Sequence, residues 1–263
     1  MWSIFKHEMK ANWKSLFIWG ICVGSMGFAC ILLFSSMQES MEGMAENFAS
    51  MGAFSDAFGM SQLSIATLMG FYATEVGTIH SLGGAMFAAI LGTVMLSKEE
   101  DGHTSEFLFS LPIARARVIA AKGCTIVTNV ILFNIICILF YLLGIWMLGE
   151  RVPVEEFALY HLMQFMMQLE IAAACYAVSA ISRKNRLGIG LGIVLFLYAY
   201  DLMARVIPDL SDYKVISPFS YANAADIFST GKIPLVGAGI GVVILIFSTA
   251  ASFVIYTKRD LLA

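Results

Sequence analysis

Charged residues are scarce in this sequence, because Asp, Glu, Lys and Arg make up only 13% of its 263 residues. Ordinary soluble domains contain roughly 25% charged residues. Hydrophobic residues, in contrast, make up 59% of the chain. This composition excludes an ordinary soluble domain and is typical of a protein whose helices lie in a lipid bilayer.

Residue patterns for catalysis or metal binding are also missing. The four histidines are scattered, and the five cysteines show neither a disulfide framework nor the paired spacing of a metal site. A P-loop needs a glycine-rich turn followed by Lys and Ser or Thr, whereas Gly231 and Lys232 continue into Ile233 and Pro234. We therefore predict that the chain is not itself an enzyme and binds neither a metal nor a cofactor.

Six apolar runs are long enough to cross a membrane, since a helix needs about 20 mostly apolar residues to do so. They cover residues 16–35, 71–96, 124–148, 157–181, 187–207 and 233–256. The sequence therefore predicts an all-α membrane protein in which residues 1–263 form a single transmembrane domain. Within the second run, Gly83 and Gly84 predict close packing between helices.

The basic residues predict how the protein is oriented, because short loops rich in Lys and Arg remain in the cytoplasm. Of the 16 Lys and Arg residues, 12 fall on one side of the predicted spans: Lys6, Lys10, Lys14, Lys98, Arg115, Arg117, Lys122, Arg183, Lys184, Arg186, Lys258 and Arg259. We therefore expect a multi-pass protein of the cell (plasma) membrane with both termini in the cytoplasm. Membrane lipid is an expected partner, and nucleic acid is not.

Three segments outside the spans have patterns of their own. Before the first span, apolar residues recur every three or four positions opposite three lysines, which predicts an amphipathic helix in the membrane interface that serves as an anchor or as a contact surface. After that span, a methionine-rich stripe favours helix packing or an adaptable apolar surface over copper(I) binding. The stripe comprises Met37, Met41, Met44, Phe48 and Met51. Residues 208–232 contain helix breakers, which predict short outer re-entrant helices between the fifth and sixth spans.

The fourth span carries three polar residues, Gln164, Gln168 and Glu170. A carboxylate in the centre of a membrane helix costs about 2.5–3.5 kcal/mol on insertion scales, so Glu170 should face protein or water rather than lipid. These residues are candidates for a translocation path or a subunit interface. The alternative is an acid that is hydrogen-bonded to a glutamine or to a neighbouring helix.

The longest charged interruption between spans covers residues 97–122, hereafter the 97–122 segment. It begins with three acids, continues through Gly102 and a short amphipathic stretch, and ends in a basic cluster. Gly102 is expected to allow the turn out of the second span, and Pro112 is expected to end the short helix. Such a helix can rest against the membrane and face a cytoplasmic partner.

This segment resembles the corresponding loop in permease subunits of ABC transporters of the type-2 exporter class. The matching residues are Glu99, Gly102, Thr104, Glu106, Leu108, Pro112, Arg115 and Lys122. In the family a threonine directly follows the glycine, whereas His103 intervenes here. An outer motif of Ser217, Pro218, Phe219 and Tyr221, and a terminal Lys258-Arg259-Asp260-Leu261 after the last span, extend the resemblance over nearly the whole chain.

The resemblance implies an ATP-driven export permease that works as a homodimer or heterodimer. Its path would be lined by the first, second and fifth spans, and separate ATPase subunits would bind ATP and Mg. The short helix in the 97–122 segment would be the coupling helix that docks on an ATPase subunit. Two other readings stay open: an ATP-independent secondary transporter or channel that uses Glu170, and a membrane sensor or immunity protein.

Overall fold

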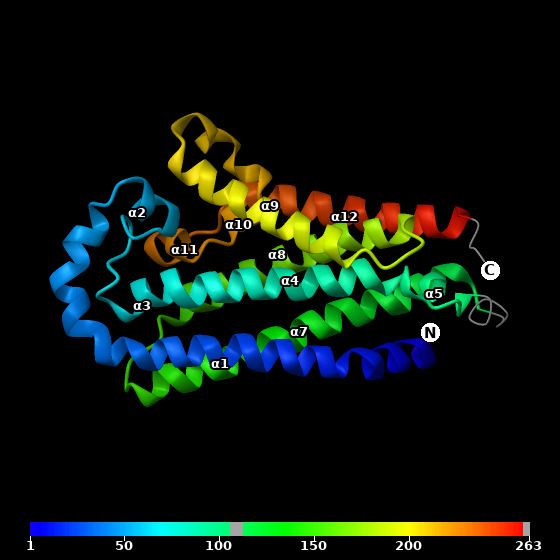
Figure 1. Cartoon of the computed structure of the whole chain (residues 1–263), viewed down its shortest axis with the longest axis horizontal. Coiled ribbons are helices and arrows are strands. Elements are labelled where there is room, and N and C mark those ends of the chain that lie inside the picture. The colour runs from blue at the N-terminus through cyan, green and yellow to red at the C-terminus, as the bar shows by residue number, and fades with distance from the viewer. Residues whose placement is uncertain (106–112, 260–263) are drawn as a thin grey trace.

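The computed structural model describes residues 1–105 and 113–259, apart from the side chains of Glu39, Glu42, Met44 and Phe48. Within these ranges every regular element is a helix and none is a strand. Figure 1 shows an elongated bundle in which the long helices lie roughly along one axis. The predicted all-α class is therefore confirmed.

Six helical segments among the described residues are long and apolar enough to cross a membrane, as the apolar runs predicted. The long helices are α1 (Trp2–Ala49), α4 (Gly77–Met95), α7 (Arg115–Met147), α8 (Val154–Ile181), α9 (Leu187–Val206) and α12 (Leu235–Lys258). The second span also includes α3 (Leu68–Phe71) and a π-helical turn, η1 (Tyr72–Val76), which lead directly into α4. The chain is thus a multi-pass membrane protein.

The N-terminal amphipathic segment is helical, as predicted, and it is not a separate helix; its position in the membrane interface stays a prediction. It continues without a break into the first span and on through all of the methionine-rich stripe except Met51, so that α1 is 48 residues long. No proline interrupts these residues, and Leu16 is buried in the bundle core. Farther along α1, Met41 packs against the core, while Met37 stays exposed.

The start of α1 and the end of α12 lie at the same end of the bundle, which we call the N/C end (Figure 1). Figure 1 shows the start of α1, the end of α12 and the short helix α5 (Lys98–Asp101) there. This arrangement agrees with an even number of spans.

Short helices cover the opposite end, which we call the distal end. They are α2 (Ala53–Phe58), the 3-10 helix η2 (Pro208–Ile216), α10 (Pro218–Tyr221) and α11 (Ala224–Thr230). Gly59 ends α2 with φ 74°, and a Cβ added there would lie 2.2 Å from Cβ of Ala225 in α11. The predicted short helices between the fifth and sixth spans are present; their entry into the bilayer stays a prediction.

Helices α4 and α8 approach each other closely because α4 has glycines at the contact. A Cβ added to Gly84 would lie 2.2 Å from Nε2 of Gln168, and one added to Gly92 would lie 2.4 Å from the backbone oxygen of Ala172. On another face of α4, Gly83 leaves room for Val23 of α1. The close packing predicted for Gly83 and Gly84 is therefore confirmed.

This close approach predicts opposite effects for two glycine-to-alanine changes in membrane helices. Gly92→Ala should destabilise the protein by about 1–3 kcal/mol, because the new methyl group meets backbone that cannot move independently. Gly192→Ala in the interior of α9 is the matched control, since its Cβ meets nothing within 4 Å. It should stabilise the helix by about 0.5–1 kcal/mol. Thermal unfolding in detergent measures both, and equal effects would contradict the proposed contact.

Candidate functional site

A buried lysine lies at the centre of the N/C end. Lys122 of α7 has 0% exposure, and its Nζ lies 2.7 Å from Oε1 of Glu8 and 2.7 Å from Oε1 of Glu99. The same ammonium donates to the backbone oxygen of Met95 over 2.9 Å. Lys98 forms a second ion pair with Glu8. We call Glu8, Lys98, Glu99 and Lys122 the ion cluster.

The ion cluster joins three parts of the chain that are distant in sequence. Glu8 lies near the start of α1, Glu99 lies in α5 just after the second span, and Lys122 lies two turns into α7. An ammonium has three N–H donors, and here each has an acceptor. Because an unpaired buried charge costs several kcal/mol, the position of Lys122 requires both carboxylates to stay close.

Glu99 also accepts a hydrogen bond of 2.6 Å from the hydroxyl of Thr104. Burial alone would raise the pKa of the Glu99 carboxyl, but Lys122, Thr104 and Lys98 together hold this pKa below its usual value. The ionised form is thus the one that the fold favours. The ionised Glu99 therefore contributes its full stabilisation when the pH is above the pKa of an ordinary carboxyl group. This stabilisation is lost as the pH falls through the lower pKa that Glu99 has in the folded protein.

The turn after α5 differs from the expectation about Gly102. Gly102 has φ −88° and ψ 3°, which other residues also adopt, whereas His103 has φ 54°. His103 therefore takes the left-handed conformation that glycine normally fills. Space rather than backbone freedom favours glycine at position 102, because a Cβ there would lie 3.0 Å from the backbone oxygen of Lys98.

Other polar contacts fix the end of α12 at the N/C end. Arg259 forms an ion pair with Glu100 and donates to the backbone oxygen of Ala180 over 2.8 Å. Arg115, at the start of α7, donates in turn to the backbone oxygens of Arg259, over 2.8 Å, and of Thr257, over 3.4 Å. The ends of α12 and α8 and the start of α7 are thus tied together through two arginines.

The residues that the resemblance assigned to coupling therefore separate into three groups. Glu99, Thr104 and Lys122 lie together in and beside the ion cluster, with Gly102 in the adjoining turn. Arg115 contacts the end of α12 instead. Glu106, Leu108 and Pro112 lie outside the described residues. The sequence reasoning missed Glu8, although it is the only acidic residue among the first 38 and therefore stood out.

The three polar residues singled out in the fourth span are all buried against their own chain. Gln164 donates to the backbone oxygen of Ala222 over 2.7 Å, and Gln168 accepts from Nδ2 of Asn134 over 2.6 Å. Glu170 accepts from the hydroxyl of Tyr221 over 2.8 Å. This is the arrangement of the alternative prediction, in which the acid is hydrogen-bonded to a neighbouring element.

Two motifs that the sequence analysis treated separately meet at Glu170. Tyr221 belongs to the outer motif, and Gly241 of α12 leaves space for the carboxylate, because a Cβ there would lie 2.6 Å from its Oε2. At the other end of the motif, Ser217 caps α10 and donates to the backbone oxygen of Leu197 in α9 over 2.8 Å. The outer motif thus connects α10 to α8 and α9.

Two of the histidines that looked scattered lie side by side in the bundle interior. The rings of His80 and His161 are 5.1 Å apart between centroids. His161 is hydrogen-bonded to Tyr72, and His80 is hydrogen-bonded to Tyr141 and to Asn134. In the part of the chain that the structure describes, no group of three or more His, Cys, Asp or Glu side chains could hold a metal ion.

Removing the central charge of the ion cluster should strongly destabilise the protein. Lys122→Met leaves Glu99 without its main partner in a partly buried site, and Glu8 keeps only Lys98; the expected loss is about 3–5 kcal/mol. The control is Lys6→Met at an exposed position of the same helix as Glu8, which should change little. Unfolding in a titration with denaturing detergent measures the stability of both variants. Recovery of stability in the double variant Lys122→Met/Glu8→Gln would support a paired charge, whereas additive losses would contradict it.

The contact between Tyr221 and Glu170 predicts a smaller effect. Tyr221→Phe removes only the hydroxyl that Glu170 accepts from, so we expect a loss of about 1.5–3 kcal/mol for a hydrogen bond to a charged group. Tyr213→Phe serves as control, because Tyr213 is 59% exposed. Thermal unfolding midpoints of both variants, measured in the same detergent, provide the comparison. Unchanged midpoints in both would mean that the bond does not stabilise the fold.

A comparison with protein families assigns the chain to a known family. Residues 2–261 match the family model described as ABC-2 family transporter protein. No curated protein sequence matches the chain at a significant level. The family match covers nearly the entire chain, including all six apolar helices and the ion cluster. The chain therefore belongs to the ABC-2 family of transporter proteins, as a membrane-spanning permease.

Proposed function

We propose that this permease is the membrane subunit of an ATP-driven exporter, which works as a dimer and is powered by separate ATPase subunits. The observation that carries the proposal is the ion cluster. It links the start and the end of the 97–122 segment, through Glu99 and Lys122, to Glu8 of α1. A partner that moves this segment would therefore also move three helices.

Energy for transport must come from outside this chain, since the sequence contains no P-loop. In the proposed mechanism, residues 106–112 dock on the ATPase subunit, which holds ATP and Mg. When two ATPase subunits close on ATP, each pulls its docked segment. Because Lys98 and Lys122 are both paired with Glu8, this displacement reaches α1, α4 and α7 together. Alternating access requires such a two-state element biased by a bound ligand.

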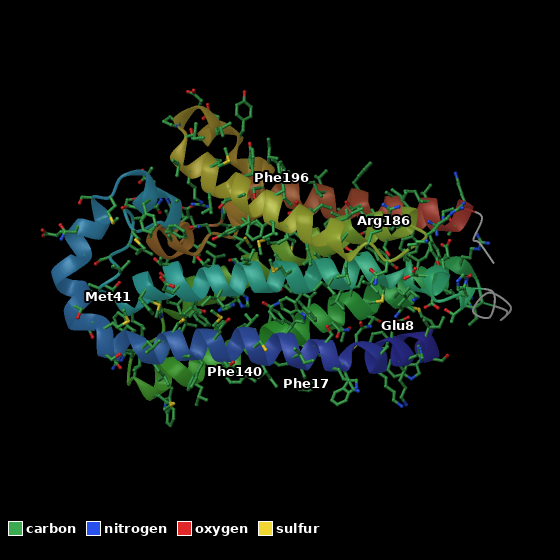
Figure 2. The ribbon with its side chains drawn as sticks, viewed as in Figure 1. Glu8, Phe17, Met41, Phe140, Arg186 and Phe196 are labelled. Carbon is green, nitrogen blue, oxygen red and sulfur yellow. The ribbon has the colours of Figure 1, made fainter. Side chains whose placement is uncertain are left out.

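The second copy of the permease is proposed to complete the path along α1, α4 and α9. Supporting this, α9 exposes large apolar side chains, of which Phe196 is 70% exposed, and α1 exposes Phe17 at 47%. Figure 2 shows these two residues on the outside of the bundle. Gln164, Gln168 and Glu170 remain candidates for the path or the subunit interface, and either role requires their present hydrogen bonds to open.

The N/C end is proposed to face the cytoplasm. Basic residues are concentrated in the segments at this end, namely the start of α1, the 97–122 segment, residues 182–186 and the end of α12. Segments rich in Lys and Arg stay inside the cell. In this orientation the 97–122 segment meets ATPase subunits in the cytoplasm, and both termini of the permease lie in the same compartment.

Charge reversal in the 97–122 segment should separate the permease from its ATPase. Glu106→Arg should abolish co-purification of the ATPase subunit and the ATP-dependent loss of substrate from cells, because the docking charge is inverted. Lys214→Glu, in η2 at the distal end, is the matched charge-reversal control and should retain both. Pull-down with a tagged permease and ATPase assays on the purified complex measure the two effects.

Two outcomes would contradict the proposal. One is a complex that survives Glu106→Arg as well as the control does. The other is substrate transport that continues at the same rate in vesicles depleted of ATP, which would favour the secondary transporter or channel.

A further inference from the structure

An apolar groove of about 490 Å³ lies between α7, α8 and α12. This volume is within the range of about 300–1,000 Å³ that is usual for sites of small organic molecules. Nearly all lining groups are hydrocarbon. They include Ile119, Ala120, Gly123 and Cys124 of α7, Ala172 of α8 and Phe253 of α12.

The groove is open because small residues face it. A Cβ added to Gly123 would meet nothing within 4 Å, so this glycine is not needed for close packing between helices. Helix α12 also packs much more extensively along α8 than along α7, which leaves the space beside α7 unfilled. In a bilayer such an unfilled apolar space has no water to occupy it and is filled by hydrocarbon.

A positive charge lies where the groove reaches the N/C end. Arg117 precedes the lining residue Ala120 by three positions, so both lie on one face of α7. Side chains of a helix tilt toward its N-terminus, which directs Arg117 toward the membrane surface. The residue is exposed, and among the described residues no group pairs with its guanidinium.

Arg115 bounds the same end of the groove. Its hydrogen bonds to the backbone oxygens of Thr257 and Arg259 bridge the start of α7 and the end of α12. The groove therefore has a polar, positively charged mouth near the membrane surface and an apolar floor that extends toward the bilayer centre. This arrangement of charge and hydrocarbon matches that of a phospholipid.

We propose that the groove binds one acyl chain of an anionic phospholipid whose phosphate lies against Arg117. Basic pockets between membrane helices are known sites for acidic lipid headgroups. The lipid would fill the gap between α7 and α12 and hold these helices at a fixed spacing. The site lies on α7, α8 and α12, away from the path proposed along α1, α4 and α9, and it does not depend on ATP-driven transport.

Lipid binding to the purified full-length permease tests the proposal. The protein in mild detergent is titrated with dioleoyl phosphatidylglycerol or with dioleoyl phosphatidylcholine, and bound lipid is counted by native mass spectrometry. We expect tighter binding of the anionic lipid. Arg117→Gln should weaken binding of the phosphatidylglycerol by about fivefold and leave phosphatidylcholine unchanged, because one basic residue near the surface contributes roughly this much.

A change that fills the groove provides the second arm. Gly123→Leu places a side chain in open space on a helix, so the fold should be retained, and binding of both lipids should be lost. Gly239→Leu in α12 is the matched control, because a Cβ there also meets nothing within 4 Å and the residue does not line the groove. Thermal unfolding confirms that both variants are folded.

Three results would overturn the proposal. Binding by the folded Gly123→Leu variant that equals that of the wild type would exclude the groove as the site. An unchanged preference for phosphatidylglycerol in Arg117→Gln would exclude the headgroup contact. Disulfide cross-linking between two copies through Cys124, which is exposed in the groove, in a Cys22→Ser/Cys30→Ser background would mean that a second permease covers the groove instead.

Discussion

The buried ammonium of Lys122 is the constraint on which the N/C end of this permease depends. A charge with 0% exposure is tolerated only with partners, and its partners come from different parts of the chain. Because Glu8 and Glu99 must both remain near it, the starts of α1 and α7 and the turn after α4 keep a fixed relation to one another. Hydrophobic packing alone would not do this, since lipid is as apolar as the helix surfaces.

The distal half of the bundle is held by hydrogen bonds and by one further ion pair. Tyr221 binds Glu170, Gln164 binds the backbone of Ala222, and Ser217 binds the backbone of Leu197. Arg205 also pairs with Asp201, one turn away in α9. The first three bonds tie the short distal helices and their connections to the long helices α8 and α9, and the ion pair stabilises the end of α9. The short distal helices are therefore part of the bundle rather than loose loops.

The spans and the short distal helices could be predicted from sequence because apolar run length and helix breakers are local properties. The partners of the polar residues could not, because Glu8 and Lys122 are 114 positions apart and only the packing of α1 on α7 brings them together. For the same reason the sequence did not show that the N-terminal amphipathic segment and the first span form one continuous helix, and the position of this segment in the membrane interface stays a prediction. The amphipathic pattern of this segment is real. Because Leu16 and Glu8 are buried against the bundle, the segment stays in line with the first span, and the two form one helix, α1. The left-handed backbone of His103 left no sequence signal either.

Polar contacts are distributed unevenly among the six spans, and this distribution bears on how the permease would move. The ion cluster joins α1, α5 and α7, and hydrogen bonds join α4, α7 and α8 in the interior. The N/C half of α9 is held by packing, with Gly190 placed against Thr93 of α4. Separating apolar surfaces within a bilayer costs little, whereas separating a buried ion pair costs several kcal/mol. A force applied at the 97–122 segment would therefore displace α1, α4, α7 and α8 together, and the adjustment would occur at α9.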